Sequence, residues 1–504
     1  MKPALWVAGL VLSCAAAVGI VCFQQQRGDA ASAAQCRSIA ARGLPGAANA
    51  TSEWIAADAK TGGPAHCLVK ATLSPVAGSA IGMVVRLPQA WNGKVLGLGG
   101  GGWAGNVTPE AAAPGLAAGY ATLQTDGGHP GTVVWDNAWA ANPVAADDFA
   151  WRAVHQMTVA GKALVAAYYG KAPARAYFNG CSTGGRQALM EAQRFPRDYN
   201  GIVAGAPVYT LQVQTSQLMR SNLFTAPGAG LGKDQLALVN RAALAACDAD
   251  DGLKDGVIAD PRACHWDPAA LACKPGEPAG QCLAPAQVAA LGAAYSGVLA
   301  PDGSWAQWPL SRGGETVWAP FIAVGGTRTP GTDGGLGTLA PVVYGSRKVD
   351  LGRFTAKDAA AARSSGFAQI YEAKNPDLSA YFAGGGKLIV WQGESDPGPS
   401  PVGAIDYVSA ATQHAPAAAA SGLRLFLLPG VGHCGGGPGA DTVDWLAAID
   451  GWAGGGAAPG RLIATKKESP LKRPLCAWPQ VARYKGTGDS NDPASYGCVA
   501  RSKV

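Results

Sequence analysis

The chain has 504 residues, of which 48% are apolar and 15% are charged, and its formal net charge is +6. A chain this long exceeds one minimal domain and predicts a large core with an inserted or second domain. The weak positive charge, without a Lys/Arg cluster or an aromatic-basic stripe, excludes a dedicated nucleic-acid-binding protein. Because the 70 glycines and 35 prolines are spread along the chain, they indicate many loops and not a disordered tract.

The N-terminus has the pattern of an export signal. Lys2 supplies a short positive region, residues 4–22 are apolar, and residues 30–34 are small enough for a cleavage site. We therefore expect a signal peptide over residues 1–34, a secreted or periplasmic protein, and no membrane attachment after cleavage. The alternative is an uncleaved anchor, since the apolar run is long enough to span a bilayer.

Cysteine usage supports export. Of the 12 cysteines, Cys14 and Cys22 lie in the signal, and the even number that remains predicts disulfides in an exported protein. No C-x-x-C spacing of zinc or thioredoxin-like sites occurs in the sequence. The simplest assignment leaves Cys181 and Cys434 over and joins near neighbours: Cys36–Cys67, Cys247–Cys264, Cys273–Cys282 and Cys476–Cys498.

The first part of the chain alternates strand and helix patterns. Short apolar runs bounded by turn residues predict strands, and apolar residues at helical spacing predict helices between them. This alternation predicts an α/β fold with a mostly parallel sheet and crossover helices. The predicted strands are 81–87, 94–98, 120–124 and 174–179, and the predicted helices are 147–169 and 186–194.

The alternation stops after residue 208 and returns near residue 380. Between them lie an acidic loop, Pro/Gly-rich stretches and several tryptophans, so we expect an inserted lid domain over residues 209–379. The flanking segments 35–208 and 380–504 would form one catalytic domain. Its later part is predicted to contain strands at 387–391 and 423–428 and a closing helix at 442–453.

A G-x-S-x-G pattern places a serine between a predicted strand and a predicted helix. Gly180 and Gly184 flank Ser182 in the sequence GCSTG. This strand–turn–helix context is typical of a nucleophile elbow, in which the serine hydroxyl is exposed at the carboxyl end of a strand. The alternative is an ordinary strand–helix turn, because the pattern alone is weak.

An acid and a base follow in the order that α/β-hydrolases use. Asp396 comes just after the strand pattern KLIVWQG, and His433 comes just after LRLFLLPG. We predict a triad in which Ser182 is the nucleophile, Asp396 the acid and His433 the base. His129 also follows a strand and could support the site or be structural. The acids that compete with Asp396 are Asp406, Asp441 and Asp444.

The two remaining cysteines lie beside the predicted nucleophile and base. Cys181 precedes Ser182, and Cys434 follows His433. A bond between them would place their Cα atoms about 4.4–6.8 Å apart and bring serine and imidazole together. The alternative is that both are free or pair elsewhere.

Backbone amides are expected to stabilise the oxyanion. One should be the N–H of Thr183, the residue after the nucleophile, and the other should come from the glycine loop 99–102. Gly101 and Gly102 are both candidates.

The sequence CDADDGLKDGVI at 247–258 packs four aspartates into eight residues. Clustered carboxylates repel one another unless they are solvated or bind a cation, and their all-oxygen character suits Ca²⁺. The loop is not an EF-hand, because Ala259 occupies the twelfth position counted from Asp248. A solvated Asp/Gly turn is the alternative.

The chain resembles the tannase and feruloyl esterase family over residues 36–500. The motifs that carry the likeness are GCSTGG with the strand ARAYFN, RFPRDYNGIVAGAP, CDADDGLKDGVI, NPDLSAYFAGGGKLIVW and GVGHC. The resemblance implies an α/β-hydrolase core with a lid, the Ser182–Asp396–His433 triad and the adjacent Cys181–Cys434 disulfide. It also implies a structural Ca²⁺ held by the side chains of Asp248, Asp251 and Asp255 and the carbonyls of Leu253 and Val257.

The resemblance also implies an activity. The expected enzyme is a secreted serine esterase that cleaves small-molecule esters of gallate, a hydroxycinnamate such as ferulate, or terephthalate through an acyl-enzyme. Lid tryptophans (Trp266, Trp305, Trp308, Trp318) could stack on the aromatic acid or simply pack. The chain departs from the family at Gln392-Gly393 and at Gly398-Pro399, which we place at the rim of the site. The alternatives are an exported lipase or peptidase, or a noncatalytic binding protein with the same fold.

Overall fold

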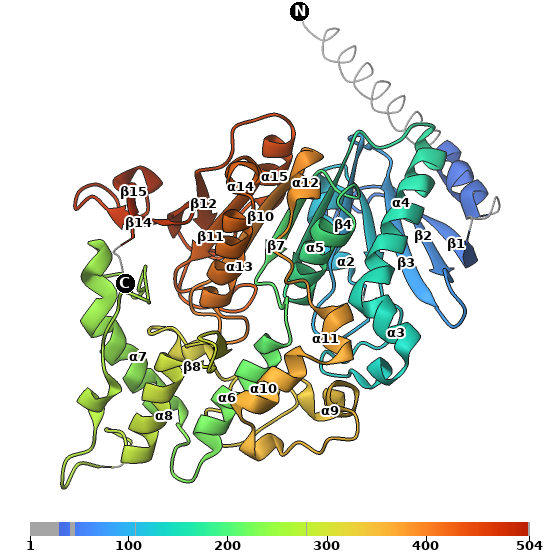
Figure 1. Ribbon diagram of the computed structural model, residues 1–504. Coiled ribbons are helices and arrows are strands. Elements are labelled where there is room, and N and C mark those ends of the chain that lie inside the picture. Colours follow the sequence, from blue (N-terminus) through green and yellow to red (C-terminus); the bar gives the residue numbers. More distant parts are fainter. Residues whose placement is uncertain (1–29, 41–45, 106, 279, 502–504) are drawn as a thin grey trace, which may run out of the picture.

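The computed structural model describes residues 30–40, 46–105, 107–278 and 280–501. Most of the predicted signal peptide lies outside these residues, and residues 30–40 are helical. A nine-stranded sheet with the order β1-β2-β3-β5-β4-β6-β7-β10-β11 runs through the molecule (Figure 1). The strands are β1 (Ala47–Ile55), β2 (His66–Leu73), β3 (Ile81–Pro88), β4 (Lys94–Leu98), β5 (Ala121–Thr125), β6 (Arg175–Cys181), β7 (Gly201–Gly205), β10 (Lys387–Gly393) and β11 (Leu423–Leu428).

The sheet is parallel from β5 through β11 and antiparallel at the β1–β3 edge. Every residue of β5 and β7 is buried; β7 is accordingly a continuous apolar run in the sequence, whereas β5 carries three buried polar residues, Thr122, Gln124 and Thr125. The parallel order places the carboxyl ends of β4, β6, β10 and β11 along one edge. This arrangement confirms the predicted α/β class.

Helices cover both faces of the sheet (Figure 1). One apolar core joins the sheet to α4 (Ala153–Tyr169), α5 (Thr183–Arg194), α13 (Pro401–His414) and α14 (Pro416–Gly422). A second core on the other face includes α2 (Pro109–Ala117) and α15 (Trp445–Ala453). Burial on both faces fixes the sheet and therefore the loops at its carboxyl edge.

Two predicted helices differ from the structure at their N-terminal ends. The stretch predicted at 147–169 starts with α3 (Pro143–Asp147) and a π-helical segment, Asp148–Arg152, before α4. Asp148 is buried there and accepts a hydrogen bond from the Ser79 hydroxyl at 2.6 Å. The closing helix begins at Trp445 because the Asp444 carboxylate caps it, accepting the N–H of Ala447 at 2.9 Å.

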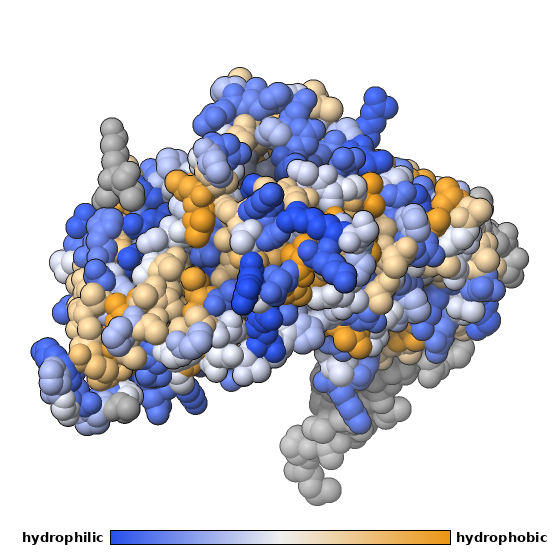
Figure 2. Space-filling view, turned by 60° about the horizontal axis from the view of Figure 1, so that its bottom comes forward, coloured by the Kyte–Doolittle hydropathy of each residue, from blue (hydrophilic) through white to orange (hydrophobic). Residues whose placement is uncertain are grey.

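The segment between β7 and β10 adds no strand to the main sheet in its described residues. Trp103 and Phe149, which precede the predicted lid boundary, pack in one apolar cluster with Leu336 and Leu339 of α9. On the face in Figure 2, hydrophobic residues form small patches between hydrophilic ones. The elements of this segment are α6 (Gln212–Thr225), α7 (Lys233–Cys247), α8 (Pro285–Ser296), β8 (Val298–Leu299), β9 (Trp305–Gln307), α9 (Leu336–Tyr344), α10 (Ala356–Arg363), α11 (Gly366–Tyr371) and α12 (Ser379–Ala383).

The C-terminal segment forms two short antiparallel pairs, β12 (Arg461–Thr465) with β13 (Lys472–Cys476) and β14 (Gln480–Tyr484) with β15 (Tyr496–Ala500). No helix within the described residues is long and apolar enough to cross a membrane.

The structure contains five disulfides. Four of them join the neighbouring cysteines that the sequence predicted to pair, and the fifth joins the two that remained: Cys36–Cys67, Cys247–Cys264, Cys273–Cys282, Cys476–Cys498 and Cys181–Cys434.

Candidate active site

Ser182 lies at the sharp turn between β6 and α5, as the sequence pattern predicts. Its backbone has a φ of 63° and a ψ of −121°, a conformation that residues with a side chain rarely adopt. The turn requires glycine on both sides. A Cβ atom at Gly180 would lie 2.5 Å from the carbonyl oxygen of Gly184, and one at Gly185 would lie 2.2 Å from that of Gly205. The backbone thus presents Ser182 at the carboxyl edge of the sheet.

Ser182, His433 and Asp396 form one continuous hydrogen-bonded chain. The His433 Nε2 atom lies 2.8 Å from Ser182 Oγ, and its Nδ1 atom lies 2.8 Å from Asp396 Oδ2. The Asp396 side chain is fully buried, whereas that of His433 is 13% exposed. The competing acids lie elsewhere: Asp441 accepts from Gly436 and Lys466, Asp444 caps α15, and Asp406 lines a different cavity.

Further buried groups hold the acid in place. The Gln392 amide donates to Asp396 Oδ2 at 2.7 Å, and the N–H of Gly398 donates to Oδ1 at 2.8 Å. Arg220 of α6 donates to the Gly398 carbonyl at 2.9 Å. Burial lowers the pKa of Arg220 to about 10, against the effect of the Asp396 charge. Gln392 is fully buried against the acid and not at the rim, which corrects the placement expected from the sequence.

A disulfide joins the turn of the serine to the loop of the histidine. The Cα atoms of Cys181 and Cys434 lie 5.9 Å apart, and 253 positions separate these residues in sequence. Cys434 has a φ of 59°, so the histidine loop bends sharply where it meets the bridge. The disulfide therefore ties the base to the nucleophile through covalent bonds.

The glycine loop after β4 lies against the start of α5. Its amides at Gly100 and Trp103 donate to other groups, at 2.9 Å to Gln187 and at 2.7 Å to Val134. The N–H groups of Gly101 and Gly102 have no hydrogen-bond partner among the described residues. The Thr183 hydroxyl donates to the Gly102 carbonyl at 2.6 Å, which connects this loop to the residue after the nucleophile.

A small cavity lies beside Ser182 and His433. The Phe321 ring stands edge-on to His433, with the ring centroids 4.8 Å apart. Among the described residues, the four lid tryptophans named above do not line this cavity, and Trp308 and Trp318 are buried in apolar cores. The lining residues are Gly102, Trp103, Trp135, Ser182, Thr183, Val208, Val213, Gln214, Gln217, Phe321, Gly334, Gly398, Pro399 and His433.

His129 belongs to a packed aromatic cluster. Its ring stacks on that of Trp139 with the centroids 4.6 Å apart, and it is 5.6 Å from that of Phe149. Burial lowers the pKa of His129 to about 4, so the ring is neutral at pH 7. The structure supports the structural interpretation of this histidine.

The acidic loop is folded around the Asp248 carboxylate. The carboxylate accepts the N–H groups of Asp255, Gly256 and Val257 at 3.2, 3.0 and 3.2 Å. Asp251 accepts only the N–H of Leu253, at 2.9 Å. Asp248 thus organises the loop, and Asp251 keeps oxygen lone pairs free for another ligand.

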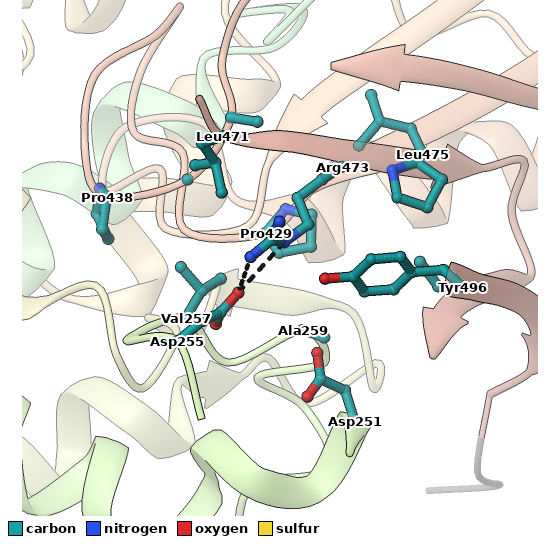
Figure 3. A pocket seen from close by; sticks show the side chains of 14 residues that line it. Asp251, Asp255, Val257, Ala259, Pro429, Pro438, Leu471, Arg473, Leu475 and Tyr496 are labelled. Carbon is teal, nitrogen blue, oxygen red and sulfur yellow. Dashed lines mark hydrogen bonds and ion pairs between the residues drawn. The ribbon is translucent and has the colours of Figure 1, made fainter. Parts of the chain in front are cut away.

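Asp251, Asp255 and Val257 face a cavity that Arg473 and Tyr496 close from the C-terminal segment (Figure 3). Arg473 pairs with Asp255 at 2.6 Å. Burial, helped by the charges of Asp255 and Asp248, raises the pKa of Asp251 to about 6. Asp251, Asp255 and Tyr496 bring side-chain oxygens to a pocket that is otherwise lined mostly by apolar residues.

The predicted ligands are not gathered as closely as in a filled site. The carboxylates of Asp248, Asp251 and Asp255 are not all within 4.8 Å of one another. Within the described part of the chain, the group that meets this distance is His155, Glu191 and Asp198, a cluster between α4, α5 and the following loop.

A family model described as tannase and feruloyl esterase matches residues 67–314 and 339–499. The chain belongs to this family. Mono(2-hydroxyethyl) terephthalate hydrolase of Piscinibacter sakaiensis is 32% identical, and the alignment covers 87% of this chain and 85% of that protein. A probable feruloyl esterase of Arthroderma benhamiae is also 32% identical, with 86% and 85% covered.

Solved structures agree with this family. Feruloyl esterase B from Aspergillus oryzae superimposes with a TM-score of 0.82 at 28% identity, covering 93% of this chain and 100% of that one. Tannin acyl hydrolase from Aspergillus niger, at 22% identity and a TM-score of 0.76, shares the fold over 92% of this chain and 95% of its own. This member of the family is a carboxylic ester hydrolase with an α/β-hydrolase fold.

The structure also contains site residues that the sequence pattern did not indicate. Gln392, Arg220, Gln214, Phe321 and Trp135 reach the site from different parts of the chain. The sequence carried one signal, the departure from the family pattern at Gln392. The others have no local motif, because only the folded chain brings them together.

Proposed function

We propose that this esterase cleaves esters of aromatic acids through an acyl-enzyme on Ser182. The observation that carries the proposal is the hydrogen-bonded chain from Asp396 through His433 to Ser182, which ends at an aromatic-lined cavity. The names of the relatives, which refer to terephthalate and feruloyl esters, support an aromatic acyl group.

The geometry supports general-base catalysis. His433 Nε2 takes the Ser182 proton while Ser182 Oγ attacks the ester carbonyl, and Asp396 stabilises the imidazolium through Nδ1. His433 then gives that proton to the leaving alkoxide, which departs as the alcohol. Water, deprotonated by His433, attacks the acyl-enzyme, and the acid leaves as Ser182 regains its proton.

The oxyanion of each tetrahedral intermediate needs preorganised donors. We assign this role to the N–H of Thr183 and to the free N–H groups of Gly101 and Gly102. One such donor is typically worth about 3–4 kcal/mol of transition-state stabilisation. We propose that residues 209–379 act as the lid, since Gln214 and Phe321 close the cavity from this segment.

We propose that the acidic loop binds a structural Ca²⁺. The carboxylates of Asp248, Asp251 and Asp255 and the carbonyls of Leu253 and Val257 would hold it, and its charge would relieve their repulsion. The loop borders Pro429 and Gly439 of the segment that carries His433, so the ion would support this segment and take no part in bond making.

We also propose that the protein is exported and that residues 1–34 are removed. The disulfides support an oxidising location. Expression of the full chain followed by N-terminal sequencing of the released protein tests this proposal. A mature N-terminus just before Cys36 is expected, and retention of Met1 in a membrane fraction would contradict it.

The activity is tested by the release of acid from methyl gallate, methyl ferulate and mono(2-hydroxyethyl) terephthalate. We expect hydrolysis of at least one of them and a loss of more than about 10³-fold in Ser182→Ala. A folded wild-type protein that hydrolyses none of the three would overturn the aromatic-ester proposal. Unchanged activity of Ser182→Ala would overturn the role of the serine.

A further inference from the structure

The loop that carries Asp396 is bound to the segment that leads to His433. Glu394, two residues before Asp396, donates its N–H to the Leu428 carbonyl at 2.9 Å, and the next residue donates to the Val431 carbonyl, also at 2.9 Å. Leu428 ends β11, and Val431 lies two residues before His433. The distance between Asp396 and His433 therefore depends on how these two segments lie against each other.

The side chain of Glu394 is fully buried and binds two arginines. Arg262 holds both carboxylate oxygens, with its Nη1 atom 2.6 Å from Oε2 and its Nη2 atom 2.7 Å from Oε1, and Arg501 donates to Oε1 at 3.2 Å. Burial alone would raise the pKa of Glu394, but the two guanidiniums hold it below its ordinary value, so the group is a carboxylate at neutral pH. Since Arg262 belongs to the inserted segment and Arg501 to the C-terminal segment, two distant parts of the chain meet at this one charge.

Asp260 and Trp478 complete a cluster in which the charges balance. Asp260 accepts from Arg262 at 2.8 Å and pairs with Arg501 at 2.6 Å. The Trp478 ring faces both guanidiniums, and its centroid lies 5.7 Å from that of Arg262 and 5.0 Å from that of Arg501. Its backbone N–H donates to the Leu425 carbonyl at 2.8 Å. The cluster is thus anchored on β11, the strand that precedes the histidine loop.

A buried ion pair of this kind contributes more to orientation than to stability. Because taking the charges out of water offsets their attraction, such a pair often adds little to the free energy of unfolding. The two parallel bonds of an arginine–carboxylate pair, in contrast, fix the direction of the carboxylate. Glu394 is not one of the described residues in the wall of the cavity beside Ser182, and Asp396 accepts its own hydrogen bonds from other groups. Glu394 therefore acts on Asp396 through the loop that they share.

We propose that Glu394 is a positioning residue for the pair of Asp396 and His433. Arg262 and Arg501 hold its carboxylate, and the carboxylate holds the Asp396 loop against the end of β11. The inference rests on the proposed function, because it takes Asp396 and His433 as the acid and the base of ester hydrolysis.

The test compares Glu394→Gln with Asp260→Asn, using whichever of the three esters named above the wild type cleaves fastest. Each variant removes one negative charge from the same cluster, but only Glu394 belongs to the Asp396 loop. In Glu394→Gln, kcat should fall about tenfold while KM changes less than about twofold, since the wall of the cavity is untouched. Asp260→Asn should keep kcat within about twofold of the wild type. A wild-type kcat in Glu394→Gln, or an equal loss in both variants, would overturn the inference.

The proton between His433 Nδ1 and Asp396 reports the same geometry without any substrate. Proton NMR of the free wild-type enzyme should show it as a separate resonance far downfield, and Glu394→Gln should shift it or broaden it beyond detection. Asp260→Asn should leave it in place. An unchanged resonance in Glu394→Gln would contradict the positioning role even if no ester is cleaved, whereas a wild type that cleaves none of the esters would contradict the proposed function.

Arg262→Lys provides the decisive variant if Glu394→Gln does not fold. Lysine keeps the charge of the cluster but cannot bind both oxygens of Glu394 in parallel, so kcat should fall at least about threefold with KM unchanged. A wild-type kcat in Arg262→Lys would then contradict the inference.

Discussion

The backbone of Ser182 is held in a conformation that a residue with a Cβ atom adopts at a cost of about 1–3 kcal/mol. Glycine adopts such positive φ values without this penalty. We therefore expect Ser182→Gly to be more stable than Ser182→Ala by about 1 kcal/mol, although both variants lack the nucleophile. Urea denaturation of the two variants measures the difference. A glycine variant no more stable than the alanine variant would show that the turn is not strained.

His129 makes stability depend on pH on the acid side. Its pKa is about 4 in the folded chain and near the ordinary 6.5 when unfolded, so the unfolded state binds more protons between these values. The stabilisation from the neutral ring is complete above pH 6.5 and decreases as the pH falls toward 4. In His129→Phe this dependence should be weaker. Thermal denaturation at pH 7.5 and pH 4.5 checks it, and identical slopes for the variant and the wild type would argue against a buried neutral imidazole.

The hydrogen-bonded arrangement of Ser182, Asp396 and His433 could be predicted because each residue lies shortly after a strand and the three occur in the order that α/β-hydrolases use. Ser182, Asp396 and His433 each carry a local signal in their neighbours, and the cysteines beside two of them indicated the bridge. Gln214 and Phe321 could not be predicted in the same way. Their position in the cavity depends on how a segment of irregular pattern folds over the sheet, and no short motif encodes that packing.

At the scale of elements, the Cys181–Cys434 bridge connects the turn after β6 to the loop after β11. Replacing both cysteines with serine should lower kcat/KM by at least about tenfold, since small misplacements of a catalytic group are costly. It should also reduce the free energy of unfolding by about 2–5 kcal/mol. Activity is measured well below the melting temperature of each variant, so that the unfolded fraction does not contribute.

The matched control removes the Cys36–Cys67 bridge, which joins the N-terminal helix to β2 at the far edge of the sheet. This control should lose stability but keep kcat/KM at low temperature. If both double variants lose activity equally, the bridge beside the triad has no special role in positioning His433.

The elements that the sequence predicted differ from the structure mainly at their ends, but β1, β2 and β7 were not among them. The strands at 387–391 and 423–428 correspond closely to β10 and β11, because buried parallel strands give short apolar runs between turn residues. The π-helical segment at 148–152 had no counterpart in the prediction, since the buried Asp148 that accompanies it interacts with Ser79, a residue distant in sequence.

At the scale of the whole molecule, the acidic loop lies where the inserted segment meets the C-terminal strands and the segment of His433 (Figure 3). Calcium bound only by the folded state should raise its stability, by about 2.7 kcal/mol at a hundredfold excess over Kd. Titration calorimetry of chelator-treated protein should show one bound Ca²⁺, and Asp251→Asn should abolish it.

Asp250→Asn is the control for calcium binding, because it removes the same charge from the same loop at a residue outside the proposed ligand set. It should bind one ion with affinity close to that of the wild type. Absence of calcium uptake by the wild type, or equal loss in both variants, would contradict the proposed site.

We propose that Ser182 carries the acyl group of an aromatic ester during turnover. The direct measurement is rapid acid quenching of the enzyme with an excess of 4-nitrophenyl ferulate, followed by peptide mass spectrometry. We predict a feruloyl mass on the peptide that contains Ser182, with a burst of nitrophenol about equal to the enzyme, and neither in Ser182→Ala. A feruloyl group on another residue, or turnover with the same rate in Ser182→Ala, would rule out Ser182 as the residue that carries the acyl group.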